Sequence, residues 1–228
     1  MGFLYEARGS DSPYLESVTR GRSEGYGSVI RPAESHWHMV LATYQGETRL
    51  LVVGPWTTAG HVTFVEGVEL LWIKFRLGAF MPHLPTRNFL DSETPLPGAS
   101  RRSFWLHSST WQFPNFENVE TFIDRLARAG TLARDPLVGP VLRGHPIESP
   151  ERTVRHRFLR ATGLNQGQIR QMKRAQQAAD LLRNGVPILD TIYQLGYCDQ
   201  PHLTRALKQW VGHTPGELAC LSRSCQLA

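Results

Sequence analysis

Four side chains that can carry positive charge recur at helical spacing in the last third of the chain. Arg152, His156 and Arg160 follow one another at intervals of four residues, and Arg155 lies beside them. In a helix this spacing places all four side chains on one side. Guanidinium groups bind phosphate oxygens and guanine edges through paired N–H donors. The stripe therefore predicts a surface that binds phosphate groups.

A second polar stripe lies between residues 199 and 210, and the beginning of its helix is well marked. Asp199 is a suitable N-cap, and Pro201 falls in the first turn, where a missing N–H costs little. Leu203, Leu207 and Trp210 would form the buried stripe of this helix. Glutamine can pair with adenine, and arginine with guanine or phosphate. The side chains expected opposite or beside the buried stripe are Gln200, Pro201, Thr204, Arg205, Lys208 and Gln209.

Two helix pairs are predicted to hold these stripes. The clearer pair is joined by the turn Gly196-Tyr197-Cys198, and two short helices on a tight glycine turn have the plan of a helix-turn-helix. The upstream pair is joined at Gly144-His145-Pro146 and is marked less strongly. A longer helix between the pairs would span ~24 Å. The helices predicted after Pro114 are Glu117–Ala129, Pro136–Leu142, Ser149–Ala161, Gln168–Arg183, Ile188–Leu195 and a last clear one from Asp199 to Gly212.

These residues resemble the AraC/XylS family of transcription regulators. RTVRHRF at 152–158, followed by ATGL at 161–164, looks like the first recognition helix of that family and its exit. Residues 188–205, followed by GHTP at 212–215, look like its second half and closing signature. The resemblance covers roughly residues 117–218. It departs from the family at His156, where arginine is usual, and at Leu207 and Trp210, which replace a commoner aromatic pattern.

The resemblance implies two recognition helices that enter successive major-groove segments on one face of double-stranded DNA, about one turn or ~34 Å apart. It also implies an N-terminal domain that senses a small molecule or mediates dimerisation, often with a cupin-like β-barrel fold. Residues and resemblance together give one predicted set of DNA contacts. The set is Arg152, Arg155, His156, Arg160, Gln200, Pro201, His202, Thr204, Arg205 and Lys208.

The charge of the chain is divided unevenly along its length. Residues 1–148 contain 14 Lys and Arg against 15 Asp and Glu, whereas residues 149–228 contain 11 against 5. The whole excess of positive charge thus lies in the region that carries the two stripes, as an anionic partner would require. The preference for arginine over lysine is also typical of a GC-rich genome.

The first half of the chain has the alternating apolar pattern of strands. Residues 1–35 are rich in Gly, Ser and charge and predict a loosely ordered N-terminal segment. HMVLATY and TRLLVVG, around Gln45-Gly46-Glu47, predict a hairpin, and the proline-rich residues 81–100 predict a long surface loop. We therefore expect an α+β chain with three parts: residues 1–35, a β-rich cupin-like domain at 36–114, and an all-α tandem helix-turn-helix domain at 115–228.

The histidines and cysteines of this chain do not predict a metal or disulfide site. His36 and His38 form a His-x-His pair, but the next acid is Glu47, and His61 and His83 are near only in sequence. The three cysteines are Cys198, Cys220 and Cys225, and they read as reduced thiols of a cytoplasmic protein. No apolar run reaches 18 residues, and the N-terminus has no apolar core of a signal peptide.

We accordingly expect a cytoplasmic, non-enzymatic DNA-binding regulator without a cofactor, acting as an N-terminally mediated homodimer and controlled by a small effector. The five tryptophans of the first half are expected in the core or at subunit contacts. The alternative is that one or two of them line a ligand cavity. Three other functions stay open. They are a metal-dependent cupin enzyme fused to a DNA-binding tail, an alkyl-accepting DNA-repair protein with a similar helical module, and an N-terminal domain that only dimerises.

Overall fold

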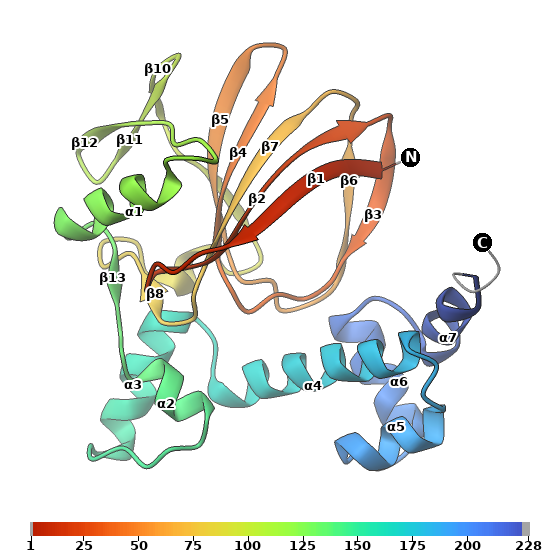
Figure 1. Cartoon of the computed structure of the whole chain (residues 1–228). Helices are drawn as coiled ribbons and strands as arrows, with labels where there is room; N and C mark the ends of the chain where they lie inside the picture. Colours follow the sequence, from red (N-terminus) through yellow and green to blue (C-terminus); the bar gives the residue numbers. More distant parts are fainter. Residues whose placement is uncertain (1, 225–228) are drawn as a thin grey trace. The chain divides into compact units, whose positions relative to one another are not determined.

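The computed structural model describes residues 2–224. Its N-terminal region is built of strands and its C-terminal region of helices (Figure 1), which confirms the expected α+β arrangement. The chain divides into two compact units. Among the described residues, the first contains 2–28, 35–55 and 63–165, and the second contains 29–34, 56–62 and 166–224.

The first unit is organised around an antiparallel sheet of six strands in the order β1-β2-β7-β4-β5-β9. The hairpin predicted around Gln45 and Gly46 is present as β4 and β5, with both turn residues at positive φ as its tight turn requires. The strands of this sheet are β1 Gly2–Gly9, β2 Leu15–Glu24, β4 His38–Tyr44, β5 Glu47–Val53, β7 Glu69–Phe75 and β9 Glu93–Pro95. Whether the sheet belongs to the cupin type stays a prediction.

The remaining strands pair in small groups. A ribbon is formed by β3 Gly27–Arg31 and β6 Gly60–Phe64, and a short pair by β8 Ala79–Phe80 and β13 Ala133–Arg134. A three-stranded sheet is formed by β10 Gly98–Ser100, β11 Ser103–Leu106 and β12 Ser109–Gln112.

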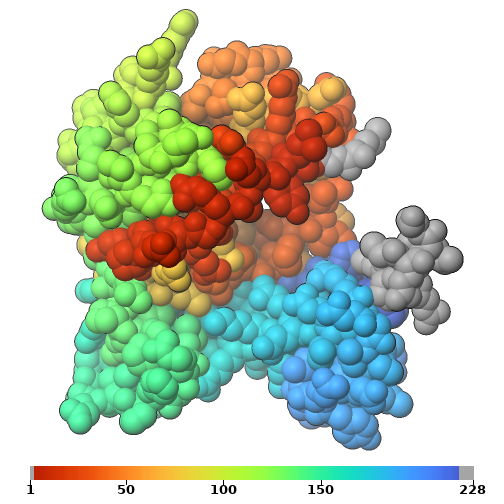
Figure 2. All heavy atoms as spheres, viewed as in Figure 1, coloured from red at the N-terminus to blue at the C-terminus, as the bar shows by residue number. Residues whose placement is uncertain are grey.

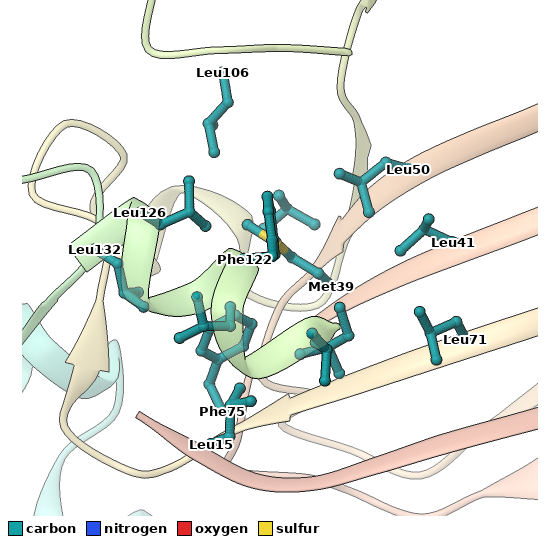
Figure 3. Close-up of a cluster of buried hydrophobic side chains, with 14 of the residues drawn as sticks. Leu15, Met39, Leu41, Leu50, Leu71, Phe75, Leu106, Phe122, Leu126 and Leu132 are labelled. Atoms are coloured by element: carbon teal, nitrogen blue, oxygen red, sulfur yellow. The ribbon is translucent and has the colours of Figure 1, made fainter. Parts of the chain in front are cut away.

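The core of the first unit lies between the main sheet and helix α1, Val119–Arg128. Alternate residues of β7 (Leu71, Ile73 and Phe75) point inward and are buried. Phe122 and Leu126 of α1 reach the same cluster (Figure 3). This burial removes a continuous apolar surface from water, which is the main favourable contribution to the stability of the unit.

Residues 1–35 differ from the loosely ordered segment that we expected. They form β1, β2 and β3, and β2 occupies an interior position of the sheet. The reason is that Leu15 and Val18 of β2 are fully buried and lie directly opposite Phe75 and Ile73 of β7, whose side chains are also fully buried. On β1, the edge strand, Leu4 and Tyr5 remain exposed, and the strand lies open in the space-filling view (red in Figure 2).

The proline-rich residues 81–100 are more ordered than the predicted surface loop. They contain a short 3-10 helix, Thr86–Phe89, in which Phe89 is buried in the core, and the strand β9. Pro95 is accommodated because β9 is the last strand of the sheet, where a missing N–H donor leaves no neighbour unpaired.

The helices follow the predicted ranges closely. After α1 they are α2 Val138–Leu142, α3 Glu151–Thr162, α4 Gln166–Arg183, α5 Ile188–Leu195, α6 Gln200–Trp210 and α7 Pro215–Ser224. About seven helices were expected after residue 114, but no range was predicted for α7, although Thr214 and Glu217 form a capping box. The Thr214 amide donates to the Glu217 carboxylate (2.6 Å) and the Glu217 amide to the Thr214 hydroxyl (3.2 Å).

None of the helices in residues 2–224 combines the length and the apolar character that crossing a bilayer demands.

Candidate nucleic-acid interface

In the second unit, α5 and α6 form a helix-turn-helix. Gly196 ends α5 in the left-handed conformation (φ 67°, ψ 38°), which glycine adopts without steric cost. Asp199 is extended and its carboxylate accepts a hydrogen bond of 2.7 Å from the His202 amide, so it is the N-cap that the sequence predicted. Turn and cap together fix the direction in which α6 leaves α5.

The inner face of α6 packs on α4. Leu203, Ala206 and Leu207 are buried on α6, and α4 presents the small residues Ala175 and Ala179 toward the same cluster. Small side chains allow two helices to approach closely, and this packing holds α6 rigidly. The predicted buried stripe is therefore correct for Leu203 and Leu207, while Trp210 is partly buried at its end.

The outer face of α6 carries most of the predicted contacts. Gln200, Pro201, Arg205 and Lys208 are exposed. Thr204 is half-buried, and its hydroxyl donates to the Gln200 carbonyl in its own helix (2.9 Å). An exposed row that contains two cationic side chains and one side-chain amide can bind phosphate oxygens and base edges from a single helix.

His202 differs from Arg205 in its surroundings. It is half-buried, and its ring meets the ring of Tyr197 edge-on at 5.2 Å. Tyr197 is itself covered by the Arg174 guanidinium of α4, 4.4 Å from the ring centre, and burial raises the pKa of its phenol. His202 thus takes part in packing the turn onto α4.

Two segments from the strand-rich half complete the second unit. The Ala33 amide donates to the Trp210 carbonyl (2.8 Å) and the Ala59 amide donates to the Gln209 carbonyl (2.7 Å). The side-chain amide of Gln176 donates in turn to the Ala33 carbonyl (3.1 Å). The last carbonyls of a helix have no partner within it, so these bonds satisfy groups at the end of α6 that would otherwise need water.

The upstream helix pair, α2 and α3, belongs to the first unit. Phe158, Ala161 and Thr162 are buried on α3, which then ends at Gly163 in the left-handed conformation. A Cβ atom at Gly163 would lie 3.1 Å from the Thr86 methyl group, so the space there is tight and the positive φ of 72° also favours glycine. The predicted outward residues Arg152, Arg155, His156 and Arg160 are all exposed.

An ion pair that the sequence did not reveal holds α3 in place. Arg157 donates two hydrogen bonds to the buried Asp135 carboxylate, at 2.7 and 3.0 Å. Burial raises the pKa of Asp135, but the bonds from Arg157 and from the Leu137 amide lower it by more, so the carboxyl is held ionised. One feature of the sequence could have indicated this ion pair. Arg157 falls outside the spacing of the outward stripe, which places its side chain toward the inner side of the helix.

The candidate metal ligands are placed apart. His36 bonds to the Glu16 carboxylate (2.9 Å), which lowers the Glu16 pKa to about 2, and His83 stacks on His107. His61 is exposed. Within residues 2–224, no group of three or more His, Cys, Asp or Glu side chains is arranged to hold a metal ion. Cys198 and Cys220 form no disulfide, and Cys225 lies outside the described residues.

The first unit also contains an open groove of about 610 Å³. Leu41, Leu71 and Phe116 contribute apolar surface to it. Arg20 lies at the groove with its guanidinium 4.5 Å from the Phe116 ring centre and bonds the carboxylates of Glu6 (2.8 Å) and Glu117 (2.9 Å). The groove combines an apolar lining with a few fixed polar groups, as small-molecule sites do.

Comparison with known proteins identifies the helical region. Residues 148–219 match the model of a family described as a helix-turn-helix domain, which confirms the module expected from the sequence. No curated protein matches the chain. A solved structure of ToxT from Vibrio cholerae aligns with 97% of this chain and 99% of its own, at 11% identity and a TM-score of 0.40, a likeness too distant to carry a conclusion.

Proposed function

We propose that this chain is a sequence-specific, double-stranded DNA-binding transcription regulator of the AraC/XylS kind that residues 117–218 resemble. The observation that carries the proposal is the geometry of α5 and α6. A glycine turn and an aspartate cap fix the start of α6. The apolar face of α6 packs against α4, and its outer face exposes Arg205 and Lys208 to solvent. This is how a recognition helix enters a major groove.

The proposal assigns different tasks to the exposed residues. Gln200 and Arg205, near the N-terminal half of α6, have the donor and acceptor patterns that distinguish adenine and guanine. Lys208 and the basic stripe of α3 would neutralise phosphates and set the register of the protein on the duplex. The role requires no catalytic step, and the metal-dependent alternative has no ligand group within residues 2–224.

Control by a small molecule is the second part of the proposal. It is supported by the groove of about 610 Å³ in the strand-rich region, whose size is in the range of ordinary ligand sites. Homodimerisation through the same region remains part of the proposal and would pair two DNA-binding halves on one operator.

The test is a footprint of the full chain on DNA upstream of its own coding sequence, with and without a pool of small metabolites. We expect a protected segment whose extent reports one or two bound chains, and a change in protection when an effector is present. Arg205→Ala should abolish the discrete footprint at a concentration where the parent protects it. Uniform protection of every fragment by both proteins would contradict sequence-specific recognition.

A further inference from the structure

A small cleft of about 360 Å³ lies in the first unit, beside the C-terminal end of α3. It is lined by Phe80, Ala133, Arg134, Asp135, Pro136, Arg157 and Arg160. Three of these seven side chains are arginines and one is acidic. The cleft is therefore basic, and it adds a residue, Arg134, that lies outside both helix-turn-helix units.

The ion pair between Arg157 and Asp135 leaves the other two arginines of the cleft without a hydrogen-bonded carboxylate partner, although the Asp135 charge also acts on Arg160. Asp135 accepts both of its arginine bonds from Arg157, and its side chain is only 4% exposed. Within residues 2–224, no carboxylate lies within ion-pair distance of Arg134 or Arg160. The cleft thus keeps a net positive charge that an anion could neutralise.

Phe80 holds the Arg160 guanidinium in place, and the strand pairing fixes the backbone from which Arg134 extends. Strand β13 pairs with β8, so that Arg134 lies opposite Ala79 and Ala133 opposite Phe80. The Asp135 amide donates to the Gly78 carbonyl (2.8 Å), which extends the pairing beyond Arg134. The Arg160 guanidinium lies 5.0 Å from the centre of the buried Phe80 ring, within cation–π range. Fixing a guanidinium before a ligand arrives lowers the entropy lost on binding.

From this arrangement we infer that Arg134 and Arg160 form a phosphate-binding site. The ligand of this site is a single phosphate group. Under the proposed function, the DNA backbone next to α3 supplies that group. The inference rests on the proposed function only in naming DNA as the source of the phosphate. A free molecule that carries a phosphate group would bind to the same two guanidinium groups. Arg134 is thereby an additional DNA contact, supplied by the short pair of strands.

The experiment measures binding of the full chain to a specific and a non-specific duplex between 50 and 200 mM salt. Arg134→Ala is compared with Arg101→Ala, which removes the same charge from the exposed turn between β10 and β11. Losing one phosphate contact should make the plot of log affinity against log salt concentration shallower by about 0.9. When salt is raised from 50 to 200 mM, the affinity of the parent should therefore fall about 3.5-fold more than the affinity of Arg134→Ala. Both duplexes should be weakened equally, and Arg101→Ala should match the parent.

A titration with inorganic phosphate at constant ionic strength, followed by ³¹P line broadening, separates the two sources. If Arg134→Ala keeps the salt slope of the parent and neither protein binds phosphate, the inferred site is wrong while the proposed function stands. If the parent binds no DNA but binds phosphate through Arg134, the site is supported with a free ligand and the proposed function fails. If neither DNA nor phosphate binds to the parent, both are overturned.

Discussion

Arg205 and Arg157 carry the same guanidinium group on helices of similar kind, yet the structure gives them different surroundings. Arg205 projects from the outer face of α6 into solvent, whereas Arg157 reaches inward to the buried carboxylate of Asp135. Within α3, Arg157 differs in direction from the exposed Arg155 because a shift of two residues along a helix turns a side chain by about 200°. Spacing in the sequence predicts the outward residues, but the partner of an inward one depends on which distant segment packs there.

Replacing Arg205 tests the DNA-binding face at the scale of one side chain. Arg205→Ala should leave the stability of the protein within ~0.5 kcal/mol of the parent, since the side chain is exposed. Specific binding should weaken by ~1–3 kcal/mol if Arg205 pairs with a base, with relaxed preference at one base position. Fluorescence anisotropy with a panel of single-base variants of the operator measures both effects.

The control for Arg205 is a change on the opposite face of the same helix. Leu203→Asp places a charge at a fully buried position and should unfold the second helix-turn-helix, which circular dichroism would show. Equal binding by Arg205→Ala and the parent at ~150 mM salt, near physiological strength, would remove α6 from the proposed interface.

At the scale of elements, helices were predictable and strand partners were not. The range Ile188–Leu195 and the Asp199 cap agree with the structure because a helix is defined by contacts three and four residues apart. Residues 1–35 gave no comparable signal. Strand β2 is stabilised by its pairing with β7, about fifty residues away, and that pairing is not encoded in the local composition.

The edge strand β1 gives an element-scale prediction on pH. Arg8 of β1 bonds the Glu120 carboxylate of α1, and this interaction lowers the Glu120 pKa from 4.5 to about 2. A carboxylate with a lowered folded pKa stabilises the protein above its unfolded pKa and loses that contribution as pH falls through the folded value. The contribution should therefore be complete at pH 6 and should disappear between about pH 4.5 and 2.

Glu120→Gln provides the measurement for this ion pair. Urea unfolding at pH 6 should show the variant to be less stable than the parent, and the gap should narrow as pH is lowered through the window above. The other carboxylates titrate in both proteins and cancel in the comparison. A gap that is constant from pH 6 to pH 3 would show that the Arg8 contact contributes nothing through charge.

At the scale of the whole molecule, the compact units do not follow the order of the chain. The domain boundary near residue 114 stays a prediction, and we also expect limited proteolysis to yield a C-terminal fragment that begins near 112–118. The second compact unit includes residues 29–34 and 56–62 as well as the helices from α4 onward. Gln176 and Ala33, which are joined by a hydrogen bond, are 143 residues apart in sequence. No pattern of neighbouring residues in the sequence could have predicted that contact. A fragment that begins near 114 lacks the groups that bond to Gln209 and Trp210.

Gly212 allows this composite unit to be tested in the intact chain. It follows α6 at φ +87°, and a Cβ atom there would lie 2.5 Å from the Ile30 side chain. Gly185 has nearly the same backbone angle, φ +82°, with nothing within 4 Å of the added atom. Gly185→Ala should therefore cost only the left-handed backbone, ~1–2 kcal/mol. Gly212→Ala should cost a further ~1–3 kcal/mol for the overpacked contact with Ile30.

Adding Ile30→Ala to Gly212→Ala decides whether residues 29–34 truly pack against the end of α6. Shortening Ile30 removes the atom nearest to the new methyl group, so the double variant should recover most of the extra loss, and the two changes should couple by ~0.5–3 kcal/mol in a double-mutant cycle. Ile30→Ala combined with Gly185→Ala should instead be additive, since those sites share no contact. The measurement is the free energy of unfolding in urea for all variants of the full chain. Additivity for the Gly212 pair would mean that the Ile30 side chain does not pack against the end of α6.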